Sequence, residues 1–148
     1  MALKKAPAGY LIDTCIWVEL ERGRLSAADL ADIVGEAAVY LSPVSIAELS
    51  MGAEMAEQEH VRTRRRETVR RLASKVAMPI DSATGEVYGL LAAKLIKAGR
   101  RSPSHRIQDL WIAAQSKQHR IRLITYNRKD FDDVPGLDVQ VLRQSSRG

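Results

Sequence analysis

The chain has 148 residues, of which 45% are apolar and 28% are charged, and its formal net charge is +5. This length and composition predict one soluble globular domain, and no segment approaches the roughly 18 uninterrupted apolar residues that a membrane-spanning helix needs. The single cysteine, Cys15, excludes an internal disulfide and a thiolate metal cage, and the positive charge suits a polyanionic partner without identifying one.

Residues 1–9 are expected to form a flexible N-terminal arm. They contain no apolar stretch before Tyr10, so they do not resemble a secretory signal. We therefore expect the protein to stay in the cytoplasm. At the other end of the chain, residues 144–148 are polar and are expected to form a frayed tail.

Short apolar runs alternate with segments of helical periodicity over residues 10–143. The extended segments are expected at residues 10–12, 39–42, 76–80, 123–126 and 139–142. The helices are expected at residues 15–21, 26–34, 43–57, 60–74, 82–99 and 107–119. Strands that alternate with helices predict one α/β domain with three α/β/α layers and a mostly parallel central sheet.

Four carboxylates follow the strands at the points where a parallel sheet binds ligands. Asp13 comes directly after the first strand, and Asp130 comes shortly after the strand at 123–126. Glu48 lies about one turn into the helix after the second strand, and Asp109 lies in the first turn of the helix that precedes the strand at 123–126. Because ligands bind beyond the carboxyl ends of parallel strands, we expect these four side chains to converge.

Three of the four acids also have an ordinary structural interpretation. Asp13 alone equally fits a helix N-cap, and Asp109 alone fits a carboxylate that complements the dipole of its helix. Glu48 alone fits a surface residue, because a rival apolar stripe runs along another side of its helix. The combination favours a metal site: carboxylates that share one pocket raise one another's pKa, and all-oxygen ligands select hard divalent cations.

Four motifs in this order and spacing resemble the PIN domain. They are YLIDT at residues 10–14, LSPVSIAEL at 41–49, IQDLWIAA at 107–114 and LITYNRKDF at 123–131. The resemblance covers about residues 10–142 and is closest to the VapC and FitB-like toxins of bacterial type II toxin–antitoxin pairs. It implies an endoribonuclease that hydrolyses RNA phosphodiester bonds with bound Mg²⁺ or Mn²⁺.

The resemblance also implies roles for individual residues. The core metal-binding and catalytic acids would be Asp13, Glu48 and Asp109. Thr14 would be a hydroxyl that hydrogen-bonds beside them, and Thr125 would help to shape the site. The fourth acid has two candidate positions: some relatives place an acid where Asn127 stands, and others combine an Asn there with an acid at Asp130. We favour Asp130 as the fourth ligand and Asn127 as a neutral ligand or orienting group.

Two kinds of protein partner are implied by the resemblance alone. One is a second copy of the chain, in a homodimer that lines up two acidic pockets. The other is a small VapB- or FitA-like antitoxin that blocks these pockets, often with an arginine, and that usually carries a DNA-binding segment.

Basic side chains cluster in two regions of the chain. The helix at 60–74 carries six arginines, which fit either a path for the RNA backbone or a solvated helix face. Other basic residues flank the acids and are expected to hold substrate phosphate: Arg100, Arg101, Arg106, Arg128 and Lys129. No aromatic cluster alternates with basic residues, so the sequence offers no stacking platform for bases.

Three further side chains near the acids receive structural interpretations. Cys15 is expected to be a small core residue whose buried surroundings raise its pKa, rather than a nucleophile. Asp132 and Asp133 follow Phe131 and are expected to begin an exposed loop.

Two functions from other classes stay open at this point. A phospho-receiver domain is also a small α/β protein with an acidic edge, but it would need adjacent acids after the first strand, where Asp13-Thr14 stands. A catalytically silent PIN scaffold that acts only as a binding partner is not separated from an enzyme by the sequence.

Overall fold

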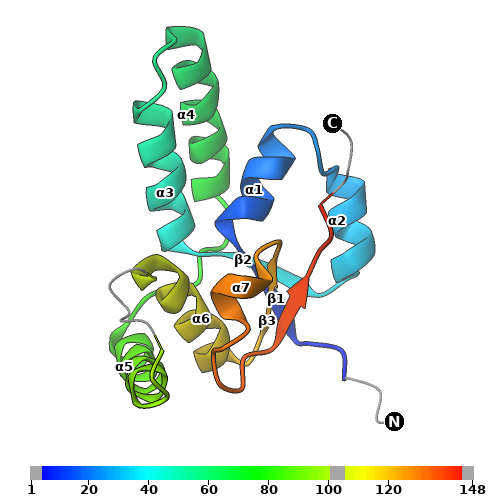
Figure 1. Ribbon diagram of the computed structural model, residues 1–148. Helices are drawn as coiled ribbons and strands as arrows, with labels where there is room; N and C mark the ends of the chain where they lie inside the picture. Colours follow the sequence, from blue (N-terminus) through cyan, green and yellow to red (C-terminus); the bar gives the residue numbers. More distant parts are fainter. Residues whose placement is uncertain (1–4, 101–105, 145–148) are drawn as a thin grey trace.

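The computed structural model describes residues 5–100 and 106–144, and its central element is one sheet (Figure 1). The strands are β1 (Gly9–Ile12), β2 (Ala38–Leu41), β3 (Arg122–Thr125) and β4 (Val139–Val141). They lie in the order β2-β1-β3-β4, and every pairing between them is parallel. The prediction of a mostly parallel central sheet is therefore confirmed.

Helices follow each of the first three strands and cover the sheet. In the described residues they are α1 (Thr14–Glu21), α2 (Ala27–Val34), α3 (Pro43–Glu54), α4 (Glu59–Ala73), α5 (Ser82–Lys97), α6 (Ile107–His119) and α7 (Arg128–Phe131). The predicted helices are present, with ends that differ by up to three residues. The short helix α7 was not predicted, because its four residues are too few to show a helical period.

Alternating side chains of β1 divide the core between the two faces of the sheet. Leu11 packs into a cluster with buried side chains of α5 and α6, whereas Tyr10 and Ile12 pack into a second cluster with α1, α2 and α4. This is the period-two alternation of a strand that is buried on both faces. The two clusters and the sheet between them make the three predicted layers.

Gly9 begins β1 one residue earlier than predicted, so the expected arm at residues 1–9 loses its last residue to the sheet. A Cβ at Gly9 would lie 3.0 Å from a ring carbon of Tyr40 and 3.1 Å from the carbonyl oxygen of Ala38, so the close approach of β2 favours glycine there. Residues 1–4 and 145–148 of the expected arm and tail lie outside the described residues. No helix in the described residues is long and apolar enough to span a membrane.

The predicted extended segment at 76–80 pairs with the sheet at a single point. The Leu41 N–H donates to the Val76 carbonyl at 3.2 Å, and the Met78 N–H donates to the Leu41 carbonyl at 2.8 Å. Ala77 forms an isolated parallel bridge with Leu41. The pairing stops there, and the next residue, Pro79, has no N–H with which to extend it.

Helices α3 and α4 form a hairpin that projects from the body of the molecule (Figure 1). Arginines of α4 hold its end together: Arg62 donates to the Ala56 carbonyl at 2.8 Å, and Arg65 donates to the Gly52 carbonyl at 3.1 Å. Arg66 pairs with Glu54 at 2.7 Å. Cations near the C-terminus of α3 also complement its dipole, so these three of the six arginines have a structural role.

A buried glutamine connects the first turn of α3 to the rest of the fold. Gln115 on α6 is fully buried; its Oε1 accepts from Ser42 Oγ at 2.6 Å and its Nε2 donates to the Met78 carbonyl at 2.7 Å. We predict that Gln115→Leu lowers the free energy of unfolding by about 2 kcal/mol or more, because it leaves two buried polar partners unsatisfied. Urea denaturation measures this loss. The exposed Gln108 on the same helix is the matched control, and an equal loss in Gln108→Leu would contradict the prediction.

Candidate active site

The carboxyl ends of the parallel strands lie at one edge of the sheet, and the predicted site residues gather there. Asp13 follows β1 directly, and Thr125 is the last residue of β3. Strand β2 lies on one side of β1 and strand β3 lies on the other side, so the strand order reverses at β1. A crevice at such a reversal is where open parallel sheets bind ligands.

Asp13 is held in place by hydrogen bonds to both of its oxygens. It is 4% exposed and is the N-cap of α1, where its Oδ1 accepts from the Thr14 N–H at 2.8 Å. Its Oδ2 accepts from Thr125 Oγ1 at 2.7 Å. Burial raises the pKa of Asp13, the hydrogen bonds act in the opposite direction, and the charge of Asp130 raises the pKa further. Asp13 is thus both a helix cap and a buried acid in the site.

Glu48 on α3 faces the site rather than solvent. Its Oε1 accepts a hydrogen bond from Thr14 Oγ1 at 3.0 Å, and burial raises its pKa. Thr14 Oγ1 also lies 2.8 Å from Oγ of Ser45, which is fully buried. Because the single hydroxyl hydrogen of Thr14 goes to Glu48, Ser45 is the donor to Thr14. The sequence analysis missed Ser45, although its position three residues before Glu48 on one helix face was a usable signal.

Asp109 has the most perturbed carboxylate of the site. It lies half-buried in the first turn of α6, and its pKa is raised from 3.8 to about 7. Burial is the largest cause, followed by the charges of Asp130, Asp13 and Glu48, while Arg106 lowers the pKa. Asp109 therefore lies close enough to each of the other three predicted acids for their charges to raise its pKa.

The predicted fourth acid, Asp130, lies on α7. Asp130 is half-buried, and its charge acts on both Asp109 and Asp13, whereas Asn127 is exposed. The Asn127 N–H donates to Thr125 Oγ1 at 3.0 Å, so the backbone of Asn127 supports the same hydroxyl that binds Asp13. These placements agree with Asp130 as the fourth acid, and the assignment of the ligand stays a prediction.

Arg106 has a structural partner in Asp133, and its predicted role as a phosphate-binding residue stays a prediction. Its Nη1 and Nη2 lie 2.7 and 2.8 Å from the two carboxylate oxygens of Asp133, and Nη2 also donates to the Asp130 carbonyl. The two side chains are 18% and 15% exposed, so the prediction that Asp133 belongs to an exposed loop is wrong. This bidentate pair clamps the start of α6, which carries Asp109, to the end of α7, which carries Asp130.

The remaining predicted side chains lie around the acids. Arg100, Arg128 and Lys129 are exposed, and Arg101 lies outside the described residues. Cys15 is half-buried and its pKa is raised to about 12, mainly by burial, which agrees with an unreactive thiol. However, Cys15 is more than a core residue, because its Sγ donates to Asp13 Oδ2 at 3.3 Å.

The donor set fits a hard divalent cation. The four predicted acid ligands are carboxylates, and Asn127 would add a neutral amide oxygen. Burial and then the charges of the three other acids raise the pKa of Asp109, and a cation would relieve this repulsion. In the described residues, no three Asp, Glu, His or Cys side chains are grouped so that they could hold an ion between them. Mg²⁺ usually takes only one or two carboxylates and completes its shell with waters and substrate phosphate, so a closed protein cage is not required.

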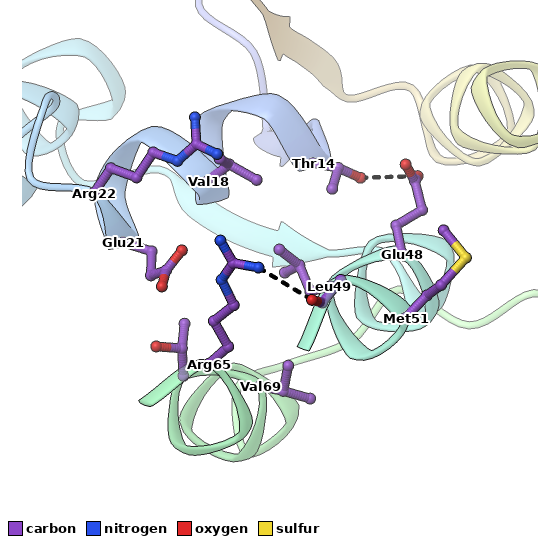
Figure 2. A pocket seen from close by; sticks show the side chains of 11 residues that line it. Thr14, Val18, Glu21, Arg22, Glu48, Leu49, Met51, Arg65 and Val69 are labelled. Carbon is purple, nitrogen blue, oxygen red and sulfur yellow. Dashed lines mark hydrogen bonds between the residues drawn. The ribbon is translucent and has the colours of Figure 1, made fainter. Parts of the chain in front are cut away.

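A pocket of about 250 Å³ opens beside the acids, between α1, α3 and α4. Figure 2 shows Thr14 and Glu48 at one end of it, joined by their hydrogen bond, and Arg22, Glu21 and Arg65 toward the other end. Nothing in the sequence pattern predicted this pocket, because its walls come from three helices that meet only in the folded chain.

Fold and site together define an α/β protein with an oxygen-rich acidic crevice at the carboxyl edge of a parallel sheet. Residues 10–137 match the PIN domain family, and the chain belongs to this family. The predicted family is thereby confirmed, and the phospho-receiver alternative is excluded.

Several relatives cover nearly the whole chain. The chain is 30% identical over 146 residues to ribonuclease VapC5 of Mycobacterium tuberculosis. This alignment covers 95% of the chain and 99% of that relative. The chain is also 30% identical over 132 residues to ribonuclease VapC1 of Rickettsia felis, and this alignment covers 88% of the chain and 94% of that relative. The chain superposes with a TM-score of 0.69 on the solved structure of VapBC-5 from M. tuberculosis, a member of the VapBC family of toxin–antitoxin systems. The two are 28% identical, and the superposition covers 93% of this chain and 99% of that one.

The raised pKa of Asp109 predicts a pH-dependent stability of the metal-free protein. Between about pH 4 and pH 7 the folded state keeps a proton on Asp109 that the unfolded state releases, so this contribution to stability falls as the pH rises and is lost above about pH 7. Asp109→Asn should therefore raise the melting temperature at about pH 8 but not at about pH 4, by about 2–4 °C for each kcal/mol recovered. Thermal melts in chelator test this, and an equal effect at both pH values would contradict it.

The clamp between Arg106 and Asp133 generates a second prediction. Asp133→Asn should lower the free energy of unfolding by about 2 kcal/mol, because it leaves a partly buried guanidinium without its charged partner. The substitution should accelerate amide hydrogen exchange more in α7 than in the sheet. The matched control is Asp132→Asn, since Asp132 is the exposed neighbour. Equal effects of the two substitutions would show that the ion pair does not anchor α7.

Proposed function

We propose that this chain is a metal-dependent endoribonuclease that acts as the toxin of a type II toxin–antitoxin pair. It would hydrolyse RNA phosphodiester bonds with Mg²⁺, or with Mn²⁺ in its place. The observation that carries the proposal is the perturbed Asp109, whose pKa is raised to about 7 by burial and by three other acids from separate segments of the chain. Its support from relatives is that two of them, each 30% identical, are named ribonuclease VapC.

In this proposal the metal is held by carboxylates from four segments. The ligands, bound directly or through water, would be Asp13 after β1, Glu48 on α3, Asp109 on α6 and Asp130 on α7. A divalent cation there would neutralise the acids, polarise the scissile phosphate and activate water for hydrolysis.

The surrounding residues fix the positions of the acids. Thr125 and the Thr14 N–H donate hydrogen bonds to the two oxygens of Asp13. Glu48 is held by a hydrogen bond from the Thr14 hydroxyl, which in turn accepts one from Ser45. Because these hydrogen bonds are made before substrate arrives, the ligands need little reorganisation on binding. Hydrogen bonds of this kind to metal ligands typically contribute about 10- to 100-fold to metal affinity or activity.

Exposed basic residues beside the acids would hold the RNA backbone. Arg128 and Lys129 occupy α7 directly before Asp130, and Arg100 follows α5. Arg101 belongs to the same proposed group. Their contacts would be with phosphates, which supply sequence-independent affinity that falls as salt rises.

An antitoxin and a second copy of the chain are the proposed protein partners. A groove of about 1100 Å³ between α1, α2, α4 and β2 is lined largely by apolar side chains, among them Leu20, Leu25, Leu30, Leu72 and Val76. Such a groove suits an amphipathic segment of an antitoxin. Exposed apolar side chains elsewhere, including Leu90, Ile96 and Ile107, provide surface for a second copy of the chain.

Cleavage of total cellular RNA by the purified, antitoxin-free protein tests the enzyme directly. We expect discrete fragments with Mg²⁺ or Mn²⁺ and none with chelator. Asp13→Asn and Glu48→Gln keep the side-chain shape and remove the charge, so each should reduce kcat/KM by more than about 100-fold, beyond what loss of a supporting hydrogen bond costs.

The control for these variants is Glu36→Gln, an exposed carboxylate outside the site. It should cleave like the wild type. Fragments that persist in Asp13→Asn would contradict the mechanism, and a folded, metal-loaded wild type without activity would favour the silent scaffold.

A further inference from the structure

We propose that the pocket between α1, α3 and α4 binds the base of the nucleotide next to the scissile phosphate, and that it selects guanine. This inference rests on the proposed ribonuclease function and adds the substrate feature that the acids themselves do not read. Helix α1 contributes Val18 and Glu21 to the pocket lining, α3 contributes Glu48, Leu49 and Gly52, and α4 contributes Arg65 and Val69.

The pocket is continuous with the acids. Thr14 and Glu48 belong both to the pocket lining and to the carboxylate site, and their 3.0 Å hydrogen bond lies at the end of the pocket that meets the acids. A phosphate placed at the acids therefore lies at the mouth of the pocket. An adjacent base could enter the pocket without stretching the backbone.

The size and the walls of the pocket suit a single base. Its volume of about 250 Å³ lies just below the roughly 300–1,000 Å³ of pockets for drug-sized ligands, which fits a group as small as one base. Val18, Leu49 and Val69 provide apolar surface for the two faces of a planar ring. Proteins read single-stranded RNA by taking unstacked bases into such sites, and this pocket supplies a place for a base that the aromatic-poor sequence did not offer.

Polar groups lie toward the end of the pocket away from Thr14 and Glu48 (Figure 2). Arg65 is anchored by one bond from Nη1 to the Gly52 carbonyl at 3.1 Å, which orients its guanidinium beside the pocket. Glu21 has a side chain only 12% exposed, and its ion pair with Arg64 is long, at 3.9 Å. The pocket thus combines an oriented donor with a carboxylate acceptor.

Guanine matches this pair of groups best. Its O6 and N7 accept from arginine, which is the commonest specific contact to this base, and its amino group can donate to a carboxylate. Adenine offers an amino donor beside N7, so the arginine would meet a donor where guanine presents an acceptor. We therefore assign Arg65 to O6 and N7 of guanine and Glu21 to the amino group of guanine.

Two helical glycines allow a test that does not depend on damaging the fold. Gly52 in α3 lines the pocket, whereas Gly89 lies in α5, outside the pocket lining. A Cβ at either position meets no atom within 4 Å. Leucine at both sites should raise helix propensity, so neither variant is expected to unfold, but only Gly52→Leu adds bulk to the pocket wall.

The substrates are short single-stranded RNAs that differ only in the base next to the cleavage site mapped for the wild type. We expect the wild type to cleave the guanine substrate with the highest kcat/KM. Gly52→Leu should lower kcat/KM for that substrate by about tenfold or more and bring it close to the values for the other bases. Gly89→Leu should retain both the rate and the preference, and Arg65→Lys, which keeps the charge but loses the planar fork, should lose the preference.

Three results would overturn the inference. One is a wild type with no preference for guanine next to the cut. Another is a preference that survives in Gly52→Leu. The third is unchanged cleavage together with weakened antitoxin binding in Gly52→Leu, which would assign the pocket to the protein partner. A failure of the ribonuclease function itself looks different, because wild type, Gly52→Leu and Gly89→Leu would then all fail to cleave any RNA in the presence of metal.

Discussion

The repulsion among four carboxylates at one edge of a parallel sheet is the constraint on which the rest of the structure depends. Parallel strands bring Asp13 and the helix α7, which carries Asp130, to the same edge, and helices α3 and α6 add Glu48 and Asp109. Burial raises the pKa of Asp109 to about 7, and the like charges of the three other acids add to the shift. Such a cluster persists only if its members are held firmly and if protons or cations balance their charge.

Neighbouring hydrogen bonds and buried side chains supply that firmness. Phe131, which is 1% exposed, anchors α7 in the core, and the ion pair between Arg106 and Asp133 ties α7 to the start of α6. Glu48 is fixed from the other side through Thr14, which also belongs to the helix capped by Asp13. Polar contacts therefore fix the positions of the acids, and the negative charge of the acids remains to be balanced by a bound ligand.

Local sequence signals were sufficient for the strands and the acids but not for the contacts that support them. Asp13 and Glu48 were predictable because a strand end and a helix register are local patterns. The partnership of Arg106 with Asp133 spans 27 residues, and Asp133 resembled an exposed loop residue because Pro135 and Gly136 follow it. Ser45 and the pocket wall at Arg65 likewise acquire their roles only when separate helices pack.

Binding of Mn²⁺ to the antitoxin-free protein, followed by electron paramagnetic resonance of the free ion, tests the central claim most directly. The account predicts saturable binding by the wild type that weakens by more than about tenfold in Asp109→Asn and in Asp130→Asn, since each removes a proposed ligand. Asp132→Asn, beside the site but exposed, should bind like the wild type. Equal Mn²⁺ affinity in the wild type and in both ligand variants would contradict the assignment of this acidic edge as the metal site.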